Sequence, residues 1–132
     1  RCQREGRGFD PLCPLHLIMN DLLDKKCTPC EGGVIPFDIS EIHKYQKKVD
    51  GWDIKKNTEN AYFLEKNFKF KNFINSQDFV NQVGKISEEE GHHPDINYGW
   101  GYAKINIMTH AIAGLSENDF ILAAKIDQIL NV

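Results

Sequence analysis

Long hydrophobic runs are missing from this chain of 132 residues. A membrane-spanning helix needs about 20 consecutive apolar residues, and the longest apolar runs here are only a few residues long. A surplus of basic charge is also missing, because 16 Lys and Arg face 19 Asp and Glu for a formal net charge of −3. The sequence therefore predicts a soluble protein that neither enters a membrane nor binds nucleic acid directly.

Cysteine is confined to the N-terminal quarter, at Cys2, Cys13, Cys27 and Cys30. Its absence after residue 30 argues against a disulfide-built fold and favours a cytoplasmic protein. Cys27 and Cys30 form a C-x-x-C pair, which is typical of half a zinc site or of a redox pair. No second C-x-x-C follows and no strand precedes the pair, so the simplest interpretation is reduced thiols in a mobile N-terminal loop.

Glycine-rich nucleotide loops, zinc-finger spacings and internal repeats are also missing, and the length fits one domain. Residues 1–18 mix Gly, Pro, Arg and Cys without periodicity, and Met19 follows. We expect Met19 to be the native start and residues 1–18 to be a dispensable, non-native or disordered extension. Residues 30–36 are rich in turn formers. Residues 19–36 are expected to form an N-terminal loop, which leaves 37–132 as a single domain.

Hydrophobic periodicity divides that domain into helices and strands. Period-2 alternation over 61–70 places Leu64 and Phe68 on one face, broken only by Lys66. Spacings of three and four residues over 72–91 predict the longest helix, with Asn72 as its cap. The predicted elements are a helix (38–49), a hairpin (51–56 with 61–70), the long helix (72–91), two strands (95–110) and a terminal helix (116–132).

This order predicts an α+β fold, in which a four-stranded antiparallel sheet carries three helices packed on one face. Gly99 and Gly101 flank Trp100 and indicate a turn between the last two strands. The apolar residues of the terminal helix cover more than one stripe of its surface. The helix is therefore expected to bury a second face against another subunit.

Two of the five histidines stand together in the stretch EEEGHHP, residues 88–94. Gly91 ends the long helix, and Pro94 biases His93 toward extended backbone. Adjacent side chains on extended backbone point apart, so His92 and His93 are expected to have different roles.

Ends of several predicted elements can converge on one rim of the fold. Glu88 lies in the last turn of the long helix, His92 and His93 follow that helix, His110 ends a strand, and Asp119 opens the last helix. Groups that titrate near neutrality in one cleft suit proton transfer. Two alternatives stay open at this point. A metal site can use His92 or His93 with His110 and a carboxylate, and a solvated helix end needs no site at all, with Asp119 serving only as a helix cap.

The spacing of these residues resembles the complete signature of the pterin-4a-carbinolamine dehydratases. The matching positions are Glu88, His92, His93, Pro94, Trp100, His110 and Asp119. The segments CTPCEGG, FKFKNF, FVNQVGKISEEEGHHPDI and GLSENDFILAAKID also resemble family segments in the family's order. The resemblance runs from about Cys27 to the C-terminus.

The resemblance implies a hydro-lyase that dehydrates 4a-hydroxytetrahydropterin to quinonoid dihydropterin. That reaction recycles the cofactor of aromatic amino-acid hydroxylases, phenylalanine hydroxylation included, and needs no metal or organic cofactor. His92 and His110 are then the acid and the base, while His93 holds the pterin.

The supporting roles follow from the same resemblance. Asp119 is expected to orient His110, Glu88 to position His92, and Pro94 and Trp100 to bind substrate, whereas Glu89 and Glu90 are left to solvent. The resemblance also implies a homodimer or homotetramer. A second class of function is a dimerisation cofactor or interaction protein that acts through the C-terminal helix, and a metal hydrolase is a third hypothesis.

Overall fold

The computed structural model describes residues 22–28 and 35–130. The predictions made for residues 1–18, for Met19 and for Cys30 concern residues outside the described part. The elements in chain order are α2 (Ile39–Gln46), β1 (Asp53–Lys56), β2 (Tyr62–Lys69), α3 (Phe73–Glu90), β3 (Asp95–Gly99), β4 (Tyr102–Ile107), the short 3-10 helix η1 (His110–Ile112) and α4 (Glu117–Leu130). The order predicted from periodicity is confirmed.

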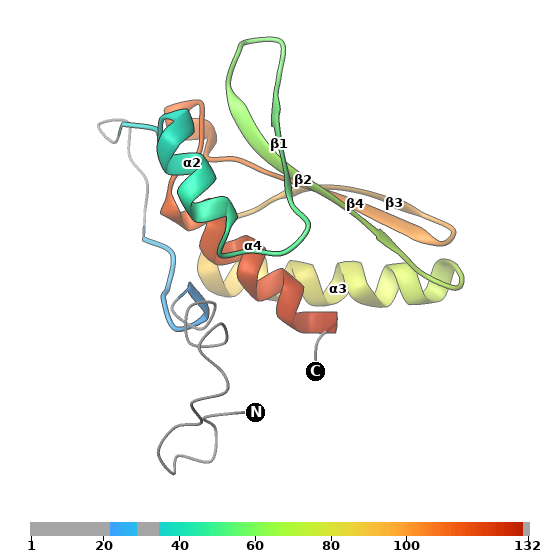
Figure 1. The fold of residues 1–132 in the computed structure, drawn as a ribbon. Coiled ribbons are helices and arrows are strands. Elements are labelled where there is room, and N and C mark those ends of the chain that lie inside the picture. Colours follow the sequence, from blue (N-terminus) through green and yellow to red (C-terminus); the bar gives the residue numbers. More distant parts are fainter. Residues whose placement is uncertain (1–21, 29–34, 131–132) are drawn as a thin grey trace.

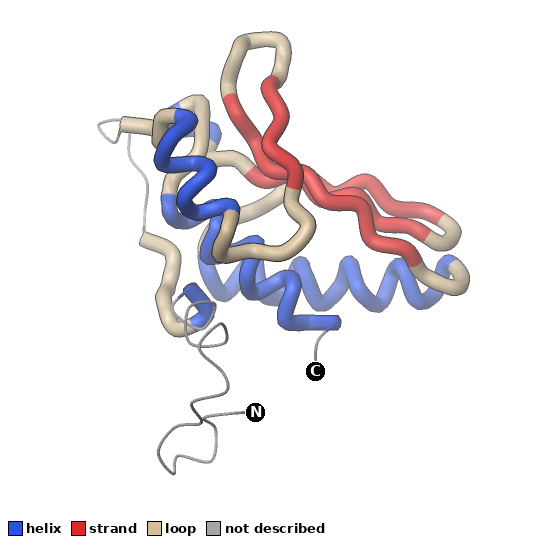
Figure 2. Tube along the Cα trace, viewed as in Figure 1, coloured by secondary structure: helices blue, strands red, loops and turns tan. Residues whose placement is uncertain are grey.

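The four strands form one antiparallel sheet in the order β1-β2-β4-β3. Helices α3 and α4 lie under the same face of the sheet, and α2 packs on α4 at the edge of that layer (Figure 1). Figure 2 shows the sheet as one twisted layer above the helices. The predicted α+β architecture is confirmed.

Alternation along the two central strands builds the core. Leu64 and Phe68 of β2 and Ile105 and Ile107 of β4 are buried, and they share a cluster with Phe79 of α3. These side chains point to one face because successive residues of a strand alternate in direction. In the part of the chain that the structure describes, no helix is long and apolar enough to cross a membrane.

Lys66 interrupts that alternation for a structural reason. It lies on the core face of β2, where its Nζ is 2.8 Å from Asp127 Oδ1 of α4. Asp127 also accepts from the buried Trp52 indole, with Nε1 3.1 Å from each carboxylate oxygen. A partly buried lysine is tolerated on this face because a carboxylate pairs with it.

The apolar residues of α4 are buried within the chain itself. They include Phe120, Ile121, Leu122 and Ile126, which all belong to the core cluster. These four side chains are therefore not available to another subunit, whereas Leu130 at the end of α4 is 52% exposed, and a contact of α4 with another subunit stays a prediction. An all-round apolar helix is typical of a buried helix as much as of an interface.

Helix α3 has the predicted start and end. The Asn72 side chain accepts from the backbone N–H of Asn75 at 2.9 Å, which caps the first turn. Gly91 ends the helix in the left-handed region, with φ 65°. Glycine adopts this conformation without the steric cost of a Cβ, and the turn directs His92 and His93 away from the helix axis.

Candidate active site

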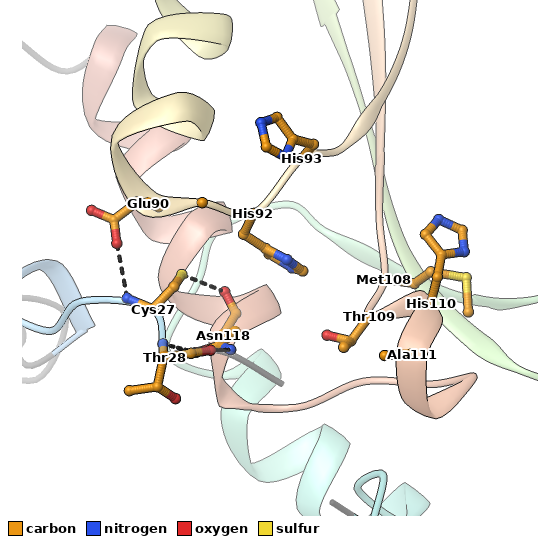
Figure 3. A pocket seen from close by; sticks show the side chains of 11 residues that line it. Cys27, Thr28, Glu90, His92, His93, Met108, Thr109, His110, Ala111 and Asn118 are labelled. Atoms are coloured by element: carbon orange, nitrogen blue, oxygen red, sulfur yellow. Dashed lines mark hydrogen bonds between the residues drawn. The ribbon is translucent and has the colours of Figure 1, made fainter. Parts of the chain in front are cut away.

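An open cavity of about 430 Å³ lies where α3 ends and α4 begins, beside the loop after β4. His92, His93 and His110 all line it, so the structure brings together the three histidines that the sequence singled out (Figure 3). Other lining residues were not predicted to belong to a site; these are Cys27, Thr28, Glu90, Met108, Thr109 and Asn118.

His92 is the anchored histidine. Its Nε2 lies 2.7 Å from Asp119 Oδ1, and the two side chains are only 13% and 0% exposed. An ionised carboxylate can only accept, so this contact places a proton on Nε2 and leaves Nδ1 as the ring nitrogen that can gain or lose one. The bond fixes both the tautomer and the orientation of the imidazole.

Asp119 is itself held rigidly at the start of α4. Its other oxygen, Oδ2, accepts from Thr109 Oγ1 and from the Ser116 backbone N–H, both at 2.8 Å. The contact with Ser116 belongs to the predicted helix cap. Asp119 therefore serves as both a cap and a histidine partner, with one carboxylate oxygen for each role.

His93 points away from His92 and meets a different acid. Its Nε2 lies 2.5 Å from Glu88 Oε2, but these side chains are 59% and 78% exposed. Water screens such a pair, so it contributes little to stability. The expectation that the two adjacent imidazoles point apart is confirmed.

The loop after β4 carries His110 to the cavity. His110 begins η1, and the loop is closed by a bridge in which the Thr109 N–H donates to the Gly114 carbonyl at 2.9 Å. Ala113 adopts a left-handed backbone with φ 53° to complete this tight turn. His110 is exposed, so its ring can exchange protons with water while it faces the cavity.

The pairing of acids with histidines differs from the expectation. Asp119 contacts His92 rather than His110, and Glu88 contacts His93 rather than His92. The reason is directional: the left-handed turn at Gly91 sends His92 toward α4 and returns His93 toward the last turn of α3.

Two predicted substrate-binding residues lie outside the cavity lining. Trp100 is at the tip of the β3–β4 hairpin, 71% exposed, at the opposite end of β3 from His93. Pro94 leads from the histidines into β3 and is also absent from the lining residues. In this chain the cavity wall is formed by other side chains.

Cys27 forms part of that wall, although the sequence placed it in a loop apart from the site. Burial, with the nearby Glu90 carboxylate, raises the pKa of its thiol to about 12. The thiol therefore stays protonated at neutral pH and presents an uncharged surface to the cavity. The segment CTPCEGG in the family resemblance was the available signal, but it indicated no role.

Glu90 is buried rather than solvated, and its assignment to solvent is wrong. Its side chain is 6% exposed and pairs with Lys125 at 2.5 Å, while Oε1 accepts from the Cys27 backbone N–H at 2.8 Å. Burial acts to raise the pKa of this carboxyl, but the bonds from Lys125 and Cys27 outweigh it and hold the pKa below its usual value.

Within residues 22–28 and 35–130, no three His, Cys, Asp or Glu side chains are grouped to hold a metal ion. The cavity does contain the imidazole of His92, which a buried carboxylate orients, and the exposed imidazoles of His93 and His110. Together these groups make the cavity one suited to acid–base catalysis on a small bound molecule.

Comparison with known proteins agrees with this class. Residues 36–129 match the family model described as pterin 4 alpha carbinolamine dehydratase. The chain is 43% identical over 111 residues to a Rubrobacter xylanophilus protein that carries the provisional name pterin-4-alpha-carbinolamine dehydratase, a match that covers 84% of this chain and all of that one. The chain belongs to the pterin-4-alpha-carbinolamine dehydratase family, a family of hydro-lyases.

Two solved structures share the fold. A transcriptional coactivator/pterin dehydratase from Brucella melitensis superposes with a TM-score of 0.64 at 26% identity, covering 71% of this chain and 97% of that one. A pterin dehydratase-like protein described as a RuBisCO assembly factor in the alpha-carboxysome gives a TM-score of 0.52 at 28% identity, covering 60% and 88%.

Proposed function

We propose that this protein dehydrates 4a-hydroxytetrahydropterin to quinonoid dihydropterin. The observation that carries the proposal is the convergence of His92, His93 and His110 on one cavity, with His92 held by the buried Asp119. Family membership supports the same reaction. In cells this activity would recycle the cofactor of an aromatic amino-acid hydroxylase.

The reaction needs one proton delivered and one removed. An acid protonates the 4a-hydroxyl, which leaves as water, and a base takes the proton from a ring nitrogen as the new carbon–nitrogen double bond forms. The proposal assigns the base to Nδ1 of His92, because Nε2 is committed to Asp119. It assigns the acid to His110, because that exposed imidazole can be reprotonated by water after each turnover.

His93 and Glu88 take a supporting part in this proposal. Their contact at 2.5 Å holds the His93 ring at the mouth of the cavity, where it can hydrogen-bond the polar edge of a pterin. Pro94 keeps the backbone after His93 extended and so helps to separate the two imidazoles.

The test is the decay of 4a-hydroxytetrahydropterin absorbance with and without protein. We expect the wild type to accelerate the decay, and the double variant His92→Ala/His110→Ala to lose on the order of 10⁴-fold in kcat, since each acid or base contributes about 10²-fold or more. His43→Ala is the matched control, because His43 is an exposed histidine on α2 that does not line the cavity. No acceleration by wild type, or full activity in the double variant, would contradict the proposal.

A second candidate function is binding to another protein or to copies of this chain. It is favoured by exposed apolar side chains at the start of α3 and on the β3–β4 hairpin; these are Phe73, Ile74, Trp100 and Tyr102. Light scattering that gives a homodimer or homotetramer, lost in Trp100→Ser, supports self-association. A monomer that retains other proteins in a pull-down supports an interaction protein instead.

A further inference from the structure

Residues 22–28 form a strap that reaches the cavity from the N-terminal side of the fold. Leu22 is fully buried in the core, and Cys27 and Thr28 line the cavity five and six residues later. In Figure 3 these two residues and Asn118 lie on one side of His92, and His110 lies on the other. The strap therefore forms the wall that faces His110 across the cavity.

Asn118 is the main attachment of this strap. Its Oδ1 accepts from the Thr28 backbone N–H at 3.0 Å, and its Nδ2 donates to the Thr28 carbonyl at 2.5 Å. One buried side-chain amide thus satisfies both backbone groups of Thr28, as a neighbouring strand would. The Cys27 thiol adds a third contact by donating to the Asn118 carbonyl at 3.5 Å.

Further contacts hold the strap against both helices that frame the site. Toward the end of α3, the Cys27 N–H donates to Glu90 and Lys26 Nζ donates to the Glu89 carbonyl at 2.9 Å. Toward the start of α4, Lys25 Nζ lies 2.5 Å from Glu117 Oε2. Lys25 does not line the cavity, so it attaches the strap without a contact to any ligand there.

We propose that the strap is the binding wall for the flat pterin ring, and that Asn118 is a positioning residue that keeps this wall docked. The inference rests on the proposed function, because it assigns a part of the same site. The strap presents Cys27 and Thr28 to the cavity, and neither side chain carries a charge at neutral pH. It therefore contributes to the fit of the pterin and not to the transfer of protons.

A quantitative expectation follows from the fraction of molecules in which the strap is docked. If only docked molecules bind substrate well, the apparent dissociation constant rises in proportion as that fraction falls. Removing both Asn118 hydrogen bonds in Asn118→Ala is expected to raise KM about five- to tenfold. The kcat and its pH profile are expected to stay within about twofold, because the contact between His92 and Asp119 is retained.

Two variants and one control test this expectation. Asn118→Ala removes the attachment beside the cavity, and Lys25→Ala removes an attachment remote from it. Both are expected to raise KM and to weaken binding of 7,8-dihydrobiopterin, a stable dihydropterin, measured by fluorescence. Gln128→Ala is the control, since Gln128 is exposed on the same helix and does not line this cavity. It is expected to change neither quantity.

Amide hydrogen exchange gives a readout that needs no catalysis. The Cys27 and Thr28 amides donate to side chains in the docked strap, so they are expected to exchange slowly in the wild type and fast in Asn118→Ala. If KM and amide protection are unchanged in Asn118→Ala, the strap proposal is wrong. A fall in kcat with a shifted pH profile also overturns it, because Asn118 then acts through Asp119.

The same measurements separate this inference from the proposed function. If the wild type does not accelerate dehydration but binds 7,8-dihydrobiopterin, and that binding weakens in Asn118→Ala, only the proposed function fails. If catalysis is present and both variants bind like the wild type, only the strap proposal fails. If the wild type neither catalyses nor binds the dihydropterin, both fail.

Discussion

Helix α4 buries two aspartates, Asp119 in its first turn and Asp127 two turns later, and they meet opposite kinds of partner. Asp119 contacts the imidazole of His92, which lines the cavity. Asp127 faces the β1–β2 side of the core and contacts the ammonium group of Lys66. The same residue type on one helix therefore serves two different purposes.

The surroundings of the two carboxylates explain the difference. Asp127 accepts from Lys66, from the Trp52 indole and from the Asp50 backbone N–H, which together satisfy a carboxylate inside the core. Burial raises the pKa of Asp127, and these donors oppose that rise. In Asp119, by contrast, Oδ2 caps the helix and Oδ1 contacts the imidazole of His92 beside the cavity. The Asp127 contacts stabilise the fold, while the contact of Asp119 with a histidine beside the cavity is the one that the proposed function uses.

The strongest test of this comparison is Asp127→Ala. Removing one partner of a buried ion pair leaves the other charge uncompensated, and we expect a loss of about 3–5 kcal/mol in the free energy of unfolding. Urea unfolding followed by tryptophan fluorescence measures it. The kcat of the folded fraction is expected to stay within about twofold of wild type.

A double variant provides the control for Asp127→Ala. Lys66→Met/Asp127→Leu replaces both charges by apolar side chains and is expected to recover part of the lost stability, since the desolvation penalty disappears with the pair while the Trp52 indole N–H stays without an acceptor. A tenfold fall in kcat of folded Asp127→Ala would mean that the two aspartates are not functionally separate.

Asp119→Asn is expected to show the reverse pattern. The amide can still accept from Ser116, but it cannot hold a protonated imidazole as a carboxylate does. We expect kcat to fall on the order of 10²-fold, with about 1 kcal/mol lost in unfolding free energy. Glu88→Gln is the matched control: it makes the same chemical change beside the exposed His93, and less than a fivefold effect on kcat is expected. Equal effects of the two variants would show that burial of Asp119 is irrelevant.

Glu90→Gln is expected to have the smallest effect and to depend on pH. The pKa of Glu90 lies below its usual 4.5 in the folded chain, so the ionised group stabilises the fold above that pH. The variant is expected to lose about 1–2 kcal/mol at pH 7, because hydrogen bonds to a charged group are among the stronger ones. The loss should shrink as pH falls below 4.5. Urea unfolding of both proteins at pH 7 and pH 4 measures it, and a difference that grows toward acid would contradict the assignment.

The helices and strands could be predicted because they depend on near neighbours in sequence. The alternation of Leu64 and Phe68, the cap at Asn72 and the glycine end at Gly91 all appear in the structure where the sequence indicated them. Each of these signals acts within a few residues. The three histidines could be selected for the same reason, since their spacing and their positions at the ends of elements are visible in the sequence.

Only the tertiary structure decided which groups meet. The partner of His92 lies 27 residues away on α4, and the backbone groups held by Asn118 lie 90 residues away in the strap. The packing of α3 against α4 brings Asp119 to His92 instead of His110, turns Glu90 inward to Lys125, and makes Cys27 part of the cavity wall. Periodicity specifies which face of an element is buried, but contacts between distant elements depend on how those faces pack, and no local pattern records that packing.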